Sequence, residues 1–400
     1  MALTDDLTPC PPAEAPTGRP RAMAALFTAA ALMTAAMAVG SAAGSIVAAD
    51  RLGPAWGGVP ATAGIVGTGL GSLLLTRAMH RRGRRTGLAY GYAAAVAGAA
   101  LAMHAVLAAD VAGLSAGMLL LGLGNAAAQL SRYAAADLYP AQRRATAIST
   151  VVWAGSVGAV GGPLLLGPSG VAAGGLGWTP LAGPFLVAAV ASVVAVLAVT
   201  AMPAGAAVTP AGSAVPLREL VGTPAARSAL SVMVTAQVVM VGVMTAAPVH
   251  MHRHGEGLGS VGAVLAGHTL GMFALSPVTG RMVDRYGARP VMLAGLGMLL
   301  LATGLAAVAA DVPGPRAVAL TVLGYGWNLC FVGGSGHLAR DLPPAERARV
   351  EGGVDATVWG VAAGAGLAST AVLSAGGYGL LAGGAGALVL LPAAALLSRR

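Results

Sequence analysis

Residues 280–289 read GRMVDRYGAR, a short polar stretch that holds three arginines and one aspartate. Apolar runs lie on either side of it, near 259–280 and 290–310, and each has the length of about 20 residues that crosses a bilayer as a helix. The two glycines of the stretch, Gly280 and Gly287, permit a tight turn. This stretch therefore predicts a loop that joins two membrane-spanning helices.

The composition of the whole chain agrees with a membrane protein. Of its 400 residues, 56% are hydrophobic and only 9% are charged, whereas soluble domains carry about 25% charged residues. The net charge of +9 does not indicate nucleic-acid binding, because the arginines fall in short clusters between apolar runs, where membrane orientation needs them. An all-arginine basic set and abundant alanine and glycine are typical of a bacterial protein, which predicts the bacterial inner membrane as the location.

The apolar runs divide the chain into two sets of six predicted helices. The first six runs lie near 22–48, 56–78, 86–108, 111–134, 146–168 and 181–202, and the second six near 228–249, 259–280, 290–310, 315–338, 352–373 and 375–397. We expect an all-α membrane protein with a disordered cytoplasmic tail (1–21), an N-terminal six-helix bundle (22–202), a cytoplasmic linker (203–227) and a C-terminal six-helix bundle (228–400).

The arginines predict the orientation of these helices. With the N-terminus inside, only Arg51, Arg253 and Arg316 of the 23 arginines fall in outside loops. Positively charged residues favour the cytoplasmic side of a membrane. The distribution therefore predicts that both termini are cytoplasmic.

The two halves of the chain also repeat one another. Residues 137–143 read DLYPAQR and residues 341–347 read DLPPAER, while RRGRR at 81–85 is matched by RYGAR at 285–289. A duplicated six-helix unit predicts two bundles around a central cavity, with the solute site near the middle of the membrane.

Residues 280–289 resemble the G-x-x-x-D-R-x-G-x-R loop signature of the major facilitator superfamily, and this resemblance covers essentially the whole chain. It implies a secondary transporter that works by alternating access. In this reading Gly280, Asp284, Arg285, Gly287 and Arg289 form a conformational latch that shuts the cytoplasmic side in one state. The N-terminal copy of the motif departs from the pattern, because threonine and histidine replace its first glycine and its aspartate.

Sulfur and imidazole groups recur at helical spacing in two predicted helices. Met240 and Met244 share one helix face, and so do His268 and Met272, because residues four apart are neighbours on a helix. Thioether and imidazole groups without a carboxylate favour a soft ion such as Cu(I). This M-x-x-x-M and H-x-x-x-M pair resembles the cox-assembly-like transporter (CalT) branch of the superfamily, which includes copper importers and members linked to flavin uptake.

Two further groups of residues fit a metal pathway, and each has another interpretation. His250, His252 and His254 lie in a predicted outside loop, where they can capture an ion or act as a pH-sensing cap. Met33 and Met37 repeat the i,i+4 spacing in the first helix, as an opposing half-site or as ordinary packing.

Two other patterns bear on transport. Gly158, Gly162 and Pro163 partly resemble the G-x-x-x-G-P stretch of facilitator antiporters. Asp355, one turn after Glu351, is a candidate proton-coupling carboxylate, although its place near the cytoplasmic end favours a helix cap or a pair with Arg144 or Arg349.

The sequence as a whole predicts an importer of copper or another soft metal, with the ion as cargo and no permanently bound cofactor. It would act as a monomer surrounded by membrane lipid. Three alternatives stay open: a proton-coupled exporter of drugs or other organic solutes, an importer of flavin or another small metabolite, and a membrane sensor that does not transport. No nucleophile with a histidine and acid partner stands out, so we do not expect an enzyme.

Overall fold

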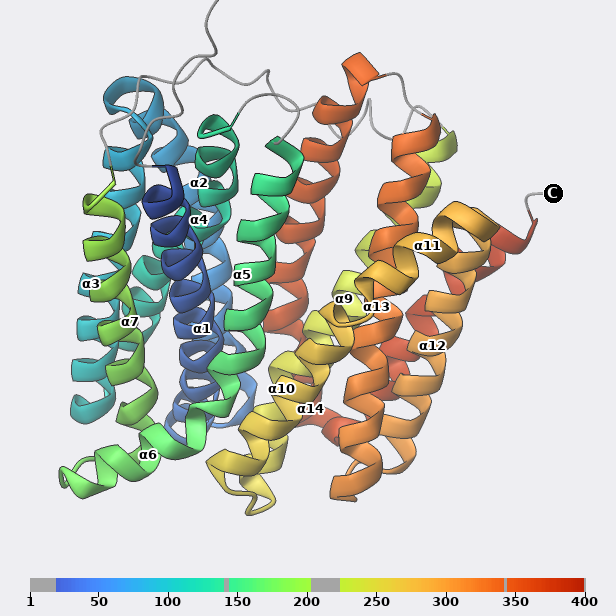
Figure 1. The fold of residues 1–400 in the computed structure, drawn as a ribbon. Coiled ribbons are helices and arrows are strands. Elements are labelled where there is room, and N and C mark those ends of the chain that lie inside the picture. Colours follow the sequence, from blue (N-terminus) through green and yellow to red (C-terminus); the bar gives the residue numbers. More distant parts are fainter. Residues whose placement is uncertain (1–18, 140–143, 203–223, 342–343, 399–400) are drawn as a thin grey trace, which may run out of the picture.

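The computed structural model describes residues 19–139, 144–202, 224–341 and 344–398, and the regular structure in these ranges is helical without a strand. The predicted tail and linker therefore lie largely outside the described residues. Two helical bundles stand side by side (Figure 1). The N-terminal bundle contains α1 (Arg19–Leu52), η1 (Pro54–Trp56), α2 (Gly58–Arg82), α3 (Arg84–Ala108), α4 (Val111–Asp137), α5 (Arg144–Leu164), α6 (Leu166–Gly175), η3 (Pro180–Ala182) and α7 (Gly183–Thr200). The C-terminal bundle contains α9 (Pro224–Arg253), α10 (Leu258–Phe273), α11 (Ser276–Tyr286), α12 (Ala288–Val308), α13 (Pro313–Asp341) and α14 (Pro344–Ser398).

Ten of the described helical segments are long and apolar enough to cross a membrane, and the bent pair α5 and α6 supplies an eleventh. The twelfth lies within α14, whose backbone breaks at Gly377 with φ 77°. Before this break, Thr370 contacts Gly58 of α2, whereas after it the chain runs beside α12 until the Leu396 carbonyl accepts a hydrogen bond from Arg289. The two parts of α14 thus cross separately, and the predicted twelve-helix fold is confirmed.

Small side chains allow the helices of each bundle to pack closely. Along α1, every seventh residue from position 22 to position 43 is an alanine that is at most 1% exposed. In lipid, small residues at a helix interface let the backbones approach, and dispersion forces replace the hydrophobic effect between helices. This face of α1 belongs to the core of the N-terminal bundle, while α9 to α14 enclose a second core.

The break between α10 and α11 is stabilised by one asparagine of α13. Asn328 donates hydrogen bonds from its amide nitrogen to the Met272 carbonyl and to the Ser276 hydroxyl, each at 2.7 Å, and it accepts one from Thr279 at 2.7 Å. A broken helix inside a membrane needs such partners, because lipid offers none to freed backbone groups. Residues 258–286 consequently form one span made of two helical pieces.

The predicted repeat is visible in the backbone at the ends of α2 and α11. Gly83 has φ 86° and ψ 161°, and its counterpart Gly287 has φ 87° and ψ 163°. This left-handed region strongly favours glycine. The same chain reversal therefore occurs at the same place in both bundles.

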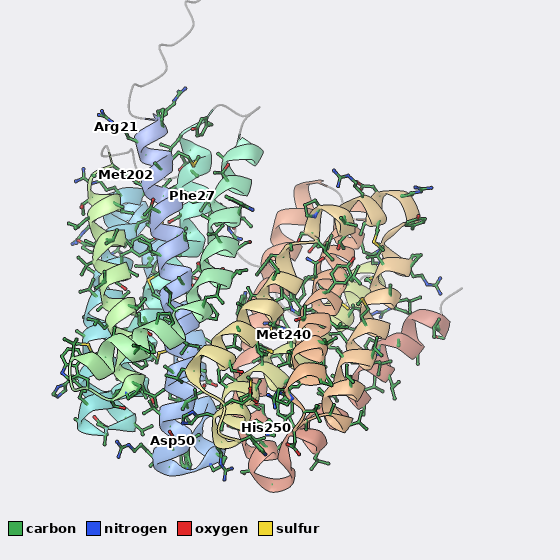
Figure 2. The ribbon with its side chains drawn as sticks, turned by 60° about the horizontal axis from the view of Figure 1, so that its bottom comes forward. Arg21, Phe27, Asp50, Met202, Met240 and His250 are labelled. Carbon is green, nitrogen blue, oxygen red and sulfur yellow. The ribbon has the colours of Figure 1, made fainter. Side chains whose placement is uncertain are left out.

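The two ends of the molecule differ in their side chains, and we name them accordingly. The Arg side is the end that carries Arg21, and the His side is the end that carries Asp50 and His250. In Figure 2 the bundles lie closest on the His side and diverge toward the Arg side. That the Arg side faces the cytoplasm remains the prediction made from the arginine distribution.

Polar contacts join the two bundles on the His side. The Gly58 amide donates to the Thr370 hydroxyl at 3.1 Å, and this hydroxyl donates to the Ala55 carbonyl at 2.9 Å. Nearby, His252 Nε2 lies 3.3 Å from an Asp50 carboxylate oxygen. The structure is thus a conformation closed on the His side.

Candidate solute site and histidine cluster

A cavity of about 240 Å³ lies between the two bundles. Helices α1, α2 and α5 line it from one bundle, and α9 and α10 from the other. The lining residues are small, apolar or hydroxyl-bearing: Ala38, Ser41, Ala42, Ser45, Ala61, Ile65, Pro163, Met240, Val241, Met244, Thr245, Pro248, Leu265 and Thr269. None of these residues is ionisable, so the cavity offers hydroxyl groups and thioethers but no formal charge.

The structure brings two of the four predicted soft ligands to this cavity. Met240 and Met244 line it, whereas His268 and Met272 do not. His268 is 4% exposed, and its Nδ1 lies 2.7 Å from the Leu320 carbonyl of α13. Since a carbonyl only accepts, Nδ1 carries the hydrogen.

Helix geometry explains why the predicted convergence does not occur. On α10 the cavity-facing residues are Leu265 and Thr269, which share one face at i,i+4. His268 precedes Thr269 by one residue, which turns it by about 100° around the helix axis. The imidazole therefore points toward α13 rather than into the cavity.

Met33 and Met37 occupy the N-terminal bundle and do not form an opposing half-site on the cavity. Met33 is fully buried, and the Ser192 hydroxyl of α7 donates to its sulfur at 3.9 Å. The end of Met37 fills the space that the missing side chain of Gly64 leaves on α2. The structure gives both residues a packing role.

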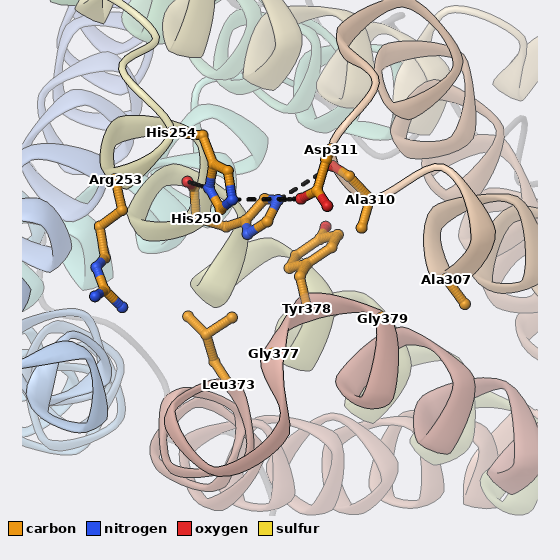
Figure 3. Close-up of a pocket in the computed structure, with 10 residues that line it drawn as sticks. All are labelled: His250, Arg253, His254, Ala307, Ala310, Asp311, Leu373, Gly377, Tyr378 and Gly379. Atoms are coloured by element: carbon orange, nitrogen blue, oxygen red, sulfur yellow. Dashed lines mark hydrogen bonds and ion pairs between the residues drawn. The ribbon is translucent and has the colours of Figure 1, made fainter.

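A cluster of titratable groups lies on the His side of the C-terminal bundle. His250 and His254, at the end of α9, meet Asp311 from the connection between α12 and α13, and one ligand atom of each lies within 4.8 Å of the other two. The close-up in Figure 3 shows both imidazole rings turned toward the carboxylate. Each Nε2 is 3.4 Å from Asp311 Oδ1.

His252 does not belong to this cluster, which corrects the prediction that the three histidines act together. Residues two apart differ by about 200° around a helix axis, whereas residues four apart share a face. His252 consequently points to the other bundle, where it meets Asp50. The predicted capture site is therefore a pair of histidines plus an aspartate.

Buried groups hold the cluster in place. The His250 ring stacks on Tyr378 with the ring centres 4.7 Å apart. Arg316 is 1% exposed, forms an ion pair with Glu256, and donates to the Ala310 carbonyl at 2.9 Å. These contacts tie the end of α9, the α12–α13 connection and α14 together around a cavity of about 580 Å³.

The residues of the predicted latch lie at the end of α11 and the start of α12, and their latch role stays a prediction. Asp284 and Arg285 are exposed, and within the described residues Asp284 has no hydrogen-bond or ion-pair partner. Gly287 makes the predicted turn, whereas Gly280 lies inside α11 and takes no part in it. Arg289 holds the far end of α14 through the Leu396 carbonyl.

The glycines of α5 serve close packing in this structure. A side chain at Gly158 would collide with the Ala31 carbonyl of α1, and a Cβ at Gly162 would lie 2.6 Å from the Ala35 carbonyl oxygen. Pro163 follows at the central cavity. Whether this stretch indicates an antiporter stays a prediction.

The side chains of Glu351 and Asp355 lie outside the described part of α14, so the predicted proton-coupling role stays a prediction.

The residues that sequence reasoning missed are Asp311, Asp50, and the hydroxyl groups of the central cavity. Alternation of the loops places Asp311 on the same side of the membrane as the histidines, but this signal alone does not pair Asp311 with them. The hydroxyl groups give no such signal, since serine and threonine are common throughout the chain.

Comparisons with known proteins agree with this architecture. A family model described as "Major Facilitator Superfamily" matches residues 229–400. The chain is 33% identical over 378 residues to the uncharacterized MFS-type transporter YdeG of Bacillus subtilis, across 90% of this chain and 87% of that protein. It is 30% identical over 325 residues to the riboflavin transporter RfnT of Brucella anthropi, across 78% of this chain and 79% of that protein. A crystal structure of a D-xylose-proton symporter has the same fold, with a TM-score of 0.72 at 17% identity over 94% of this chain and 97% of that chain.

Proposed function

The chain belongs to the Major Facilitator Superfamily, and we propose that it moves an uncharged, hydroxyl-bearing organic solute through the central cavity by alternating access. The observation that carries this proposal is the lining of the cavity, which holds no ionisable residue. A charged solute would lose its hydration on entering the cavity and would find no opposite charge there, which costs much free energy. A neutral solute loses only its hydrogen bonds to water, and the cavity hydroxyls replace them.

Four hydroxyl groups supply these hydrogen bonds. Ser41 and Ser45 come from α1, Thr245 comes from α9, and Thr269 comes from α10. Each side chain both donates and accepts, which suits the hydroxyl groups of a polyol or sugar-like chain. Because the two bundles contribute hydroxyl groups on opposite walls, one solute bridges them and its release lets them rock apart.

Riboflavin is the first solute to test, because one relative is a riboflavin transporter and riboflavin is uncharged and carries a polyol chain. The cavity of about 240 Å³ is smaller than the roughly 300–1,000 Å³ of pockets that hold drug-sized ligands. A flavin therefore requires the bundles to separate further than they do in this conformation. A smaller polyol fits the cavity as it stands.

The test is uptake of radiolabelled riboflavin, and of small polyols in parallel, into proteoliposomes. Thr245→Val removes a cavity hydroxyl and is expected to lower the apparent affinity about 3- to 10-fold, since one hydrogen bond contributes about 0.5–1.5 kcal/mol. Thr303→Val is the matched control, because within the described part of the chain the Thr303 hydroxyl bonds inside α12, to the Leu299 carbonyl at 2.8 Å and the Leu300 carbonyl at 3.1 Å. Equal affinities for all three proteins would refute the proposed role of the cavity.

Copper import is the second candidate, favoured by the two thioethers of Met240 and Met244 on the cavity wall. Thioethers are soft ligands that suit Cu(I), but His268 is held away by its bond to the Leu320 carbonyl. Copper uptake in a copper-deficient host should therefore depend on the methionines and not on His268. A double Met240→Ala/Met244→Ala variant that loses copper uptake and keeps riboflavin uptake would favour copper over flavin as the cargo of this site.

A further inference from the structure

We propose that His250, His254 and Asp311 bind one divalent transition-metal ion of the Zn²⁺ class on the His side of the C-terminal bundle. This site is separate from the central cavity, and it does not depend on which solute the transporter moves. Its role is structural: it fastens the end of α9 to the α12–α13 connection.

The hydrogen bonds of His254 prepare it as a ligand. Its Nδ1 lies 2.8 Å from the His250 carbonyl oxygen, which only accepts, so Nδ1 carries the hydrogen. In the neutral ring the lone pair is then on Nε2, which faces the Asp311 carboxylate at 3.4 Å. The Nε2 lone pair and the carboxylate oxygen therefore face each other without a hydrogen between them, and a cation placed there would accept electrons from both atoms. Metal-binding histidines usually donate their second ring nitrogen to a carbonyl in this way.

The two nitrogen–oxygen distances of the cluster fit a tetrahedral ion. Zinc–nitrogen and zinc–oxygen bonds of about 2.0–2.1 Å place neighbouring ligands of a tetrahedron roughly 3.3–3.4 Å apart. The two nitrogen–oxygen distances in the cluster are both 3.4 Å, which is longer than the 2.7–3.2 Å of ordinary N–H···O hydrogen bonds. The groups are therefore spaced for a shared ion better than for direct hydrogen bonds.

His250 can join the ion at small cost. Its Nε2 lies 3.1 Å from the Ala310 carbonyl oxygen, so without an ion Nε2–H donates there. Binding requires the other neutral tautomer, with the hydrogen on Nδ1. The Ala310 carbonyl keeps a partner in that state, because Arg316 donates to it at 2.9 Å. The stacking of His250 on Tyr378 holds the ring in position throughout.

The donor set selects the class of ion. Two imidazole nitrogens and one carboxylate suit Zn²⁺, Co²⁺ or Ni²⁺, whereas Mg²⁺ and Ca²⁺ favour oxygen ligands and Cu(I) favours sulfur. The adjoining cavity of about 580 Å³ leaves room for water to complete the coordination. His254 and Asp311 are 50% and 71% exposed at their side chains, so an ion reaches them directly from solvent.

The test is zinc binding to the full-length protein in detergent, purified with a tag that lacks histidine, by competition with a chromophoric zinc chelator. We expect one Zn²⁺ per chain. His254→Ala and Asp311→Asn should each raise the Kd by at least about tenfold, because loss of a direct ligand should cost no less than loss of a residue that only hydrogen-bonds to a ligand. Both positions are exposed, so these variants should retain the helical circular-dichroism signal and the elution profile of the wild type.

The chain offers a matched control for this experiment. His252 and Asp50 form a second histidine–carboxylate pair at 3.3 Å, outside the cluster. His252→Ala and Asp50→Asn should leave the zinc Kd within about twofold of the wild type. The proposal is overturned if the wild type binds no stoichiometric zinc, which would mean that a proton alone bridges these groups. It is also overturned if the His254 and Asp311 variants bind zinc as tightly as the wild type.

Discussion

Replacement of Thr370 by valine should shift the protein away from the conformation closed on the His side. The Thr370 hydroxyl accepts from the Gly58 amide and donates to the Ala55 carbonyl, and so joins the two bundles. Valine has nearly the same shape but offers neither bond. When the bundles separate on this side, the threonine hydroxyl can still bond to the Leu367 carbonyl of its own helix, which is 3.4 Å away. The substitution therefore penalises the closed conformation selectively.

The size of this effect follows from the difference in hydrogen bonds between the two conformations. The hydroxyl makes two bonds to the other bundle in the closed conformation and keeps one within its own helix when the bundles separate. One net bond contributes about 0.5–1.5 kcal/mol, so valine should change the ratio of the two conformations by roughly 2- to 12-fold. Thr370 is fully buried, so water cannot readily replace the lost bonds.

Thiol labelling of the central cavity measures the shift. In a background without Cys10 and Cys330, a cysteine at Ser45 lies on the cavity wall. A membrane-impermeant reagent added from the His side should label it faster in the Thr370→Val protein, by a factor in the range given above. Thr370→Ser keeps the hydroxyl and should label like the wild type. Labelling rates within twofold of each other for Thr370→Val and the wild type would refute the role of this contact.

Two further substitutions test the packing and the buried charge. Gly158→Ala should lower the thermal unfolding midpoint, because the added Cβ would collide with the Ala31 carbonyl. Overpacking of this kind costs about 1–3 kcal/mol of stability. Gly161→Ala is the control and should leave the midpoint unchanged, because its Cβ would have no atom within 4 Å. Glu256→Gln should be more severe, about 3–5 kcal/mol, because Arg316 would keep a buried charge without its partner. An unchanged unfolding midpoint for Glu256→Gln would show that the charge of Glu256 contributes little to stability.

The fold could be predicted from the sequence because lipid imposes simple rules on it. Segment length, arginine position and the turn at Gly287 are local properties, and each follows from a single stretch of chain. The break inside α14 could also be predicted from the sequence, because two predicted spans meet at residues 373–375, close to Gly377. Local patterns thus specify where helices begin, end and reverse.

The site was harder to predict, because it depends on rotation about helix axes and on contacts between distant segments. The spacing of His268 and Met272 shows that they share a face, but not that this face turns to α13 while Thr269 meets the cavity. Asp311 lies about sixty residues from His250 in the chain, and no periodicity connects them. Only the packing of α9 against its neighbours brings these two groups together.

The reversal at Gly377 also bears on how the protein enters the membrane. Residues 357–398 form one apolar helical stretch of 42 residues that is interrupted only by this glycine. The stretch is twice the length of one crossing, and no polar loop separates its two halves during synthesis. We expect the last two spans to leave the translocon together as a helical hairpin. The turn exposes only the short segment 374–377, so we expect a protease or an antibody to find less chain to recognise there than at the longer connections.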